Sequence, residues 1–210
     1  IMSFIRFGTL AVTAIAVTLS SVAPARSQEE WVPGKFMIEA IGEMLDAAEL
    51  LNRKIGYGYA EGACMAGVLL HPKESYSLSR RFKEGVPYAI IAGGDSDAID
   101  IDVEIIDSRG ILVIRDDRED RMGVIEWTPE VTGEYNLRVN LFDGKREAFC
   151  AFAILRRDGY DIPLKDAVHA AGKFFGDCLQ IVATAQKNKS AVDFLSGAGQ
   201  SGLWGTVLPK

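Results

Sequence analysis

Histidine and cysteine are scarce in this chain, which holds two histidines and three cysteines among 210 residues. The spacing of Cys64, Cys150 and Cys178 fits no zinc motif, because structural zinc sites draw their ligands from short Cys and His pairs. Neither His71 nor His169 has the neighbours of a catalytic triad, and no G-x-S-x-G nucleophile elbow occurs. Zinc chemistry and the common serine and cysteine hydrolases are therefore disfavoured.

A basic stripe is also missing. The 23 Lys and Arg residues are outnumbered by 29 Asp and Glu residues, and the formal net charge is -6. Nucleic acid is not expected as a partner, because phosphate contacts need clustered Lys and Arg. The densest charged run, residues 115–121, mixes both signs. It predicts a solvated hairpin loop, and a contact surface for a partner is the alternative.

Long hydrophobic runs are lacking apart from residues 7–22, which carry no charge. Arg6 precedes this run, and the small residues Ala23, Ala25 and Ser27 follow it. The pattern predicts a signal peptide over residues 1–27, with cleavage after Ala25 or Ser27. The run is shorter than the ~20 residues that a membrane-spanning helix needs, although an uncleaved anchor is the alternative. We therefore expect a periplasmic or secreted protein.

Export bears on the three cysteines, because disulfides form in oxidising compartments. One pair can close there, which leaves one thiol over. We predict Cys64 and Cys178 as the pair, since both lie near the predicted helical parts of the fold. Three buried thiols are the alternative.

Two segments have the helical period. Residues 34–52 predict an N-terminal helix with an apolar face formed by Ile38, Ile41, Leu45 and Ala48. Residues 164–187 predict a C-terminal helix, and Pro163 suits its first turn. The Gly-rich tail, residues 191–210, is either flexible or held to the body by Trp204.

Between the helices the period changes to two. Ile99, Ile101, Val103 and Ile105 alternate with acidic residues, which predicts a half-buried strand. Asp143-Gly144 predicts a β-hairpin. Residues 148–155 are apolar on both faces, which indicates a central strand or one covered by a helix.

About eight such strands, at the roughly 8–12-residue spacing of sandwiches, predict a mainly β fold. The expected architecture is a jelly-roll-like antiparallel β-sandwich over residues 63–157. An N-terminal helix with a Gly-rich linker (28–62) and a C-terminal helix (158–190) flank it. Tyr135 follows Gly133 at the start of a strand, where an aromatic ring is expected to cap the core as in a tyrosine corner.

Three stretches carry a likeness to a known family. They are Tyr76-Ser77-Leu78 with 84–88 (EGVPY), residues 100–110 (DIDVEIIDSRG), and Thr128-Pro129 with 133–139 (GEYNLRV). In this order they resemble the bacterial pre-peptidase C-terminal (PPC) domain. The resemblance implies a β-sandwich that serves secreted peptidases and other exported enzymes as an accessory module for substrate or surface binding, and some members bind calcium. Here two helices flank the sandwich instead of a peptidase domain.

Four aspartates are candidate calcium ligands: Asp95, Asp97, Asp100 and Asp102. Calcium takes six to eight oxygen ligands, several of them from carboxylates. Asp100 and Asp102 point to one side of a strand, about 7 Å apart, and the other two precede that strand in a loop. The alternative is a solvated polar face whose turn aspartates bond their own backbone. No other cofactor is expected.

These observations favour an exported, non-catalytic binding or assembly module of the periplasm or cell exterior, PPC-like and stabilised by calcium if the aspartates bind it. Its expected partner is a protein or another component of the cell envelope. One alternative is a structural subunit of an envelope complex that is held by an uncleaved N-terminal anchor. The other is a secreted hydrolase with a carboxylate site, because paired carboxylates can perform such chemistry.

Overall fold

The computed structural model describes residues 35–188 and 202–207. All of these residues belong to one compact unit, Pro33–Lys210. The predicted signal peptide, residues 1–27, lies outside the described residues, as does most of the predicted tail. None of the described helices is long and apolar enough to cross a membrane.

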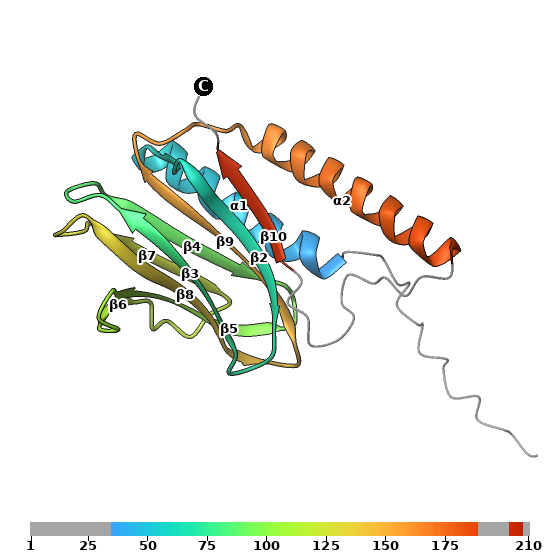
Figure 1. Cartoon of the computed structure of the whole chain (residues 1–210), viewed down its shortest axis with the longest axis horizontal. Helices are drawn as coiled ribbons and strands as arrows, with labels where there is room; N and C mark the ends of the chain where they lie inside the picture. Colours follow the sequence, from blue (N-terminus) through green and yellow to red (C-terminus); the bar gives the residue numbers. More distant parts are fainter. Residues whose placement is uncertain (1–34, 189–201, 208–210) are drawn as a thin grey trace, which may run out of the picture. The chain divides into compact units, whose positions relative to one another are not determined.

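Helices lie near both ends of the described chain, and strands fill its middle (Figure 1). In chain order the elements are α1 (Lys35–Ile55), β1 (Tyr57–Tyr59), β2 (Gly62–Leu70), β3 (Ser75–Phe82), β4 (Tyr88–Gly94), β5 (Ala98–Asp107), β6 (Leu112–Arg115), β7 (Met122–Trp127), β8 (Gly133–Gly144), β9 (Ala148–Arg157), α2 (Leu164–Lys187) and β10 (Gly202–Val207).

The strands form two antiparallel sheets. Sheet A has six strands, in the order β10-β2-β9-β4-β7 with β1 also paired to β9, and sheet B has the order β3-β8-β5-β6. Strands of sheet B pack on sheet A, and α1 packs on β4 and β9 of sheet A. The predicted mainly β sandwich with flanking helices is therefore confirmed.

Helix α1 lies close to sheet A because small residues face it. A Cβ atom built on Gly93 of β4 would lie 3.0 Å from the backbone nitrogen of Met44. The buried residues of the helix are Met37, Ala40, Ile41, Met44, Leu45 and Ala48. The predicted apolar face is thus right for three of its four members. Ile38 is 53% exposed, because the stripe runs through Met37 and Met44 instead.

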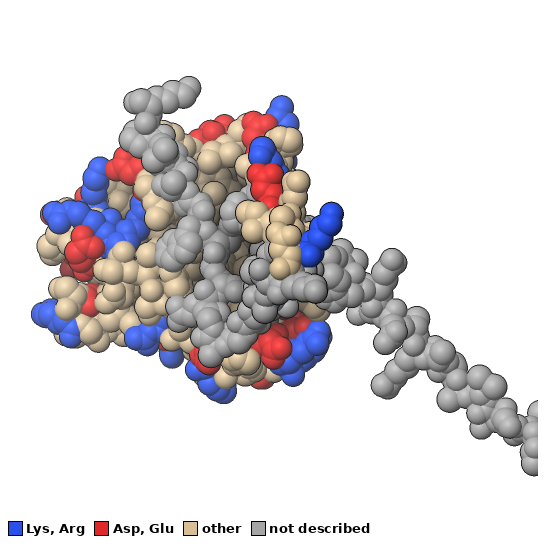
Figure 2. All heavy atoms as spheres, turned by 45° about the vertical axis from the view of Figure 1, so that its right-hand side comes forward, with Lys and Arg blue, Asp and Glu red and all other residues tan. Residues whose placement is uncertain are grey.

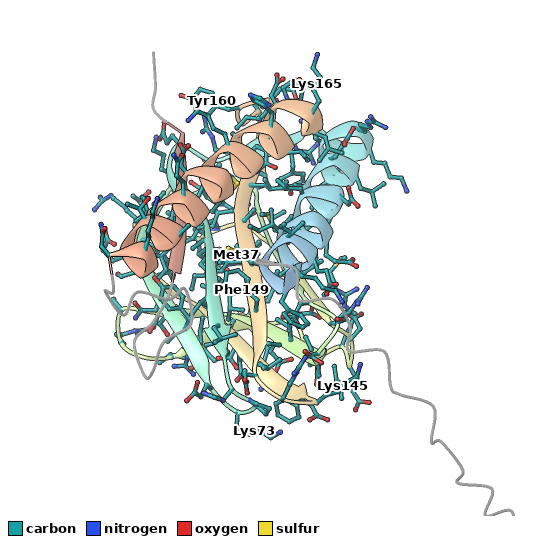
Figure 3. The ribbon with its side chains drawn as sticks, turned by 90° about the vertical axis from the view of Figure 1, so that its right-hand side faces the viewer. Met37, Lys73, Lys145, Phe149, Tyr160 and Lys165 are labelled. Carbon is teal, nitrogen blue, oxygen red and sulfur yellow. The ribbon has the colours of Figure 1, made fainter. Side chains whose placement is uncertain are left out.

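Strand β9 occupies the middle of sheet A, between β2 and β4. Its inward-facing Phe152 meets Tyr76 of sheet B, with 6.0 Å between ring centroids. Because side chains alternate along a strand, Phe149 lies on the opposite face, toward α1. Figure 3 shows Phe149 and Met37 on this helix-bearing side. The prediction of a central strand that is apolar on both faces is confirmed.

Aromatic rings close one end of the sandwich. Tyr135 packs edge-to-face on Trp127, with 4.8 Å between centroids, and its hydroxyl donates to the carbonyl of Val131 at 3.0 Å. Phe82 contacts both Trp127 and Tyr88. The expected capping role of Tyr135 is therefore confirmed.

The predicted hairpin at Asp143-Gly144 is wrong. Strand β8 continues through these residues, and Asp143 stands opposite Asp100 of β5 in sheet B. The next strand, β9, belongs to sheet A. Residues 145–147 therefore carry the chain from one sheet to the other, so the short turn joins two layers rather than two paired strands.

Part of the Gly-rich tail forms a strand. β10 pairs antiparallel with β2 at the edge of sheet A, and Trp204 stands opposite Ala66. Helix α2 precedes β10 in the chain and contacts α1. The described part of the tail is thus held to the body by its backbone.

Candidate binding surfaces

A row of carboxylates lies along the outer face of β5. Asp100, Asp102 and Glu104 are only 6–8% exposed. The carboxylate of Glu104 pairs with Arg138 at 3.2 Å and with Arg115 at 3.6 Å. The strand expected to be half-buried therefore differs from the prediction on its acidic side, which is covered as well, and at Ile99, which is 47% exposed.

The surroundings of Asp100 and Asp102 disfavour the ionised form of both side chains. Burial raises the pKa of Asp100, and the nearby Glu119, Asp120 and Asp143 raise it further. Burial likewise raises the pKa of Asp102, with Asp100 adding to the effect. One oxygen of Asp100, Oδ1, is buried and has no hydrogen-bond donor among the described residues. This oxygen can accept a proton or a cation.

Asp95 and Asp97 instead serve the turn between β4 and β5. The carboxylate of Asp95 accepts hydrogen bonds from the backbone NH groups of Phe149, at 2.7 Å, and of Asp97, at 2.9 Å. Asp97 pairs with Arg146 at 2.7 Å. Lys145 donates to the carbonyl of Ser96 at 2.8 Å, so the same turn is fastened from two sides.

The structure therefore divides the four predicted calcium ligands into two pairs with different neighbours. Among the described residues, no group of three or more His, Cys, Asp and Glu side chains is arranged to hold a metal ion. Both oxygens of Asp95 and one oxygen of Asp97 are bonded to protein donors, whereas Oδ1 of Asp100 has no donor among the described residues. Calcium binding stays a prediction, and only the second pair fits it.

Hydrogen bonds and ion pairs hold the charged run that begins at the end of β6, residues 115–121, in place. Asp116 is buried and accepts hydrogen bonds from the side chain of Arg118, at 2.9 Å, and from the backbone NH of Val124, at 2.6 Å. Burial acts to raise the pKa of Asp116, but these donors outweigh it and the pKa is lowered. Arg121 pairs with Glu43 of α1 at 2.5 Å. The predicted solvated loop is correct for the exposed Asp117 and wrong for Asp116.

Just before this charged run, the edge of sheet B exposes three consecutive apolar residues. Ile111, Leu112 and Val113 are 53%, 50% and 43% exposed. Within the described part of the chain β6 has β5 as its one strand neighbour. The ladder shifts register between Ile105 and Ile106, so Val113 stands opposite neither of them. We call residues 111–113 the apolar edge.

At the other edge of sheet B, a bulge and an arginine form a cleft. Strands β1 and β2 both pair with β9, but Tyr59 stands opposite Leu155 and Met65 opposite Ala153. Residues 61–64 therefore form a bulge in the pairing with β9. The guanidinium of Arg80, on β3, donates to the carbonyls of Ala63 and Glu61 in this bulge.

The cleft beside this bulge has a volume of about 310 Å³ and collects positive charge. Its lining includes Glu61 and four cationic residues: Arg80, Arg81, Lys83 and Arg156. Lys83 pairs with Glu61 at 3.0 Å, and this hydrogen bond lowers the pKa of Glu61. Nε of Arg156 is buried and has no acceptor among the described residues. We call this site the basic cleft.

The basic cleft was not predicted, although the sequence holds one signal for it. Tyr76, Leu78 and Phe82 are the apolar members of the inward face of β3, and the position between the last two is Arg80. An arginine in an inward series must find acceptors. The acceptors here are bulge carbonyls, which sequence periodicity does not reveal.

The histidines and cysteines do not come together as a described site. His71 and His169 are exposed on separate elements, and Cys64 is buried in β2. Cys150 is buried in β9, and burial raises the pKa of its thiol. The side chain of Cys178 lies outside the described residues, so the predicted Cys64–Cys178 disulfide stays a prediction.

No family model and no curated protein matches the chain. Among solved structures, the crystal structure of Aeromonas hydrophila PliG, a periplasmic lysozyme inhibitor of g-type lysozyme, is similar over 46% of this chain and 91% of that chain. The identity is 15% and the TM-score 0.33, which is too low to support an inference about function. The resemblance to the PPC domain stays a prediction.

Proposed function

We propose that this protein is an exported, non-catalytic binding module of the periplasm or cell exterior, and that its partner is a protein that packs on the apolar edge. The observation that supports this is the exposure of Ile111, Leu112 and Val113 where the edge strand β6 begins. Single exposed apolar residues are normal on a protein surface. Three in sequence on a sheet edge attract other chains, and proteins usually avoid that arrangement unless it has a use.

The surroundings of the apolar edge suit a protein interface. Arg109 pairs with Asp107 at 2.8 Å at one end of the edge, and Arg115 pairs with Glu104 at the other. An apolar centre with a polar rim is the usual anatomy of such interfaces. Figure 2 shows acidic and basic side chains interspersed on the face that it presents.

The proposal is tested by the size of the native complex. The double variant Leu112→Lys/Val113→Lys places charge in the apolar edge, and Val131→Lys does the same at another exposed apolar residue, 63% exposed. We expect the wild type and Val131→Lys to elute with a partner after gentle extraction from the source cells. The double variant should elute alone with an unchanged Tm. Elution of all three as monomers would contradict the proposal.

We also propose that calcium, if it binds, is held at Asp100 and Asp102. The buried, unpartnered Oδ1 of Asp100 supports this choice over the Asp95 pair. The chemistry it would supply is charge neutralisation, because the cation would offset the carboxylates of Asp100, Asp102 and Asp143 on the outer face of sheet B. The alternatives of an anchored envelope subunit and a hydrolase stay predictions.

A further inference from the structure

We propose that the basic cleft binds an oxyanion, the carboxylate or phosphate group of a small molecule, and that Arg156 and Lys83 hold it. The cleft lies between β3, an edge strand of sheet B, and residues of β2, β4 and β9 of sheet A. Its volume of about 310 Å³ lies at the lower end of the range for small-molecule sites. The proposal is independent of the apolar edge, because β3 and β6 are the two opposite edges of sheet B.

Arg156 supplies the clearest sign that the cleft can hold an anion. It lies near the end of β9, opposite Tyr88 of β4, and is partly buried. Its Nε is buried without an acceptor among the described residues. A buried donor without an acceptor is unfavourable, and a guanidinium edge matches two oxygens of a carboxylate or phosphate. A bound oxyanion would provide the acceptor.

Arg80 contributes positive charge to the cleft rather than hydrogen bonds to a ligand. Its guanidinium is already bonded to the carbonyls of Glu61 and Ala63. Burial lowers its pKa, and the nearby Arg156 acts in the same direction. The like charges of Arg80 and Arg156 both line the cleft. An anion bound there would offset these charges, which a neutral ligand would not do.

Glu61 occupies part of this positive field and would compete with a ligand. Its carboxylate pairs with Lys83, and both side chains are about half exposed, at 44% and 60%. An exposed pair of this kind is weak and can exchange partners. Nearby, the hydroxyl of Tyr88 accepts from the backbone NH of Lys83 at 3.3 Å, which leaves its proton for donation to a ligand. Release of Glu61 would therefore free Lys83 for the oxyanion.

The test is titration of the purified chain with inorganic phosphate, sulfate and succinate, followed by calorimetry and by thermal melting at low ionic strength. Lys83→Gln and Arg156→Gln each remove one proposed contact. Glu61→Gln removes the competing carboxylate. Arg109→Gln removes the same charge from an exposed position at the apolar edge and serves as the matched control.

We expect at least one of the three anions to bind and to raise the Tm. Arg156→Gln should weaken that binding about tenfold or more, because a hydrogen bond to a charged group is lost. Glu61→Gln should tighten it several-fold, an effect that a purely structural role of the cleft would not produce. If Arg156→Gln does not fold, Lys83→Gln, at an exposed side chain, still tests the site.

Binding of phosphate and sulfate but not succinate would assign the site to tetrahedral oxyanions, and the reverse would assign it to carboxylates. The proposal is overturned if none of the anions binds at concentrations up to about 10 mM. It is also overturned if Lys83→Gln and Arg156→Gln both bind as well as the wild type and the control Arg109→Gln.

Discussion

The carboxylate of Asp95, in the turn between β4 and β5, accepts a hydrogen bond at 2.7 Å from the backbone NH of Phe149, 54 positions later in the chain. Its other oxygen accepts from the backbone NH of Asp97. The residue is 1% exposed. Asp95, which the sequence suggested as a metal ligand, thus serves as the hydrogen-bond acceptor for a backbone NH near the start of β9.

Asp95→Ala is therefore expected to lower the free energy of unfolding by about 1–3 kcal/mol, because the amides of Phe149 and Asp97 lose their acceptor in a buried place. Denaturant unfolding measures the change. Asp117→Ala, in the exposed part of the charged loop, is the control and should change stability by less than about 0.5 kcal/mol. Equal midpoints for the two variants would show that the Asp95 bonds contribute nothing.

Gly58→Ala should destabilise the fold by about 1–3 kcal/mol, because the new Cβ has no room. A Cβ built on Gly58 would lie 2.5 Å from the carbonyl carbon of Gly159 and 2.7 Å from the carbonyl oxygen of Tyr160, both of them backbone atoms. Gly42→Ala is the matched control, since a Cβ in the middle of α1 meets nothing within 4 Å. It should stabilise by about 0.5–1 kcal/mol, because alanine suits a helix better than glycine. Thermal melting that shows the same sign for both variants would contradict this packing.

Asp100→Asn is expected to raise the Tm at pH 7. Burial and neighbouring carboxylates raise the pKa of Asp100 in the fold, so its ionised form is less favourable there than in the unfolded chain. The cost is present above the folded pKa and disappears as the pH falls through it toward the unfolded value of about 3.9. The advantage of Asp100→Asn should shrink over the same interval. A pH-independent difference in Tm between the two proteins would refute the electrostatic cause.

Calcium titration distinguishes the two aspartate pairs. If calcium binds the wild type, the Tm should rise with its concentration, as expected for a ligand of the folded state. The calcium-dependent rise should vanish in Asp100→Asn/Asp102→Asn and persist in Asp97→Asn, whose carboxylate already pairs with Arg146. Loss of the rise in Asp97→Asn alone would move the site to the turn. No rise at about 5 mM calcium would leave the aspartates with structural roles only.

The hydrophobic periodicity of the sequence predicts the helices and strands better than it predicts how the strands pair. Residues 148–155 predict a central strand because apolar side chains occupy both faces, and β9 has sheet B on one face and α1 on the other. The same rule fails at Ile99, which is 47% exposed, because the register of β5 shifts on both sides of Asp100. A bulge of this kind leaves the alternation of residue types unchanged, so the sequence does not reveal it.

The candidate sites depend on contacts between distant segments, and this explains why they were found only in part. The carboxylates of β5 were evident from their spacing, but Asp143 joins them from β8 through strand pairing. No local pattern predicts that Arg80 and Arg156 meet in one cleft, since they come from strands of different sheets.

Site-specific photocrosslinking from the apolar edge tests the central claim most directly. A photoreactive amino acid is placed at Leu112 in the full chain, in the source cells, and at Val131 as the exposed apolar control. The proposed function predicts one adduct of defined mass from Leu112, absent from Val131 and suppressed by excess purified wild type but not by Leu112→Lys/Val113→Lys. Identical adducts from both positions, or none from Leu112, would contradict a protein-binding role for this edge.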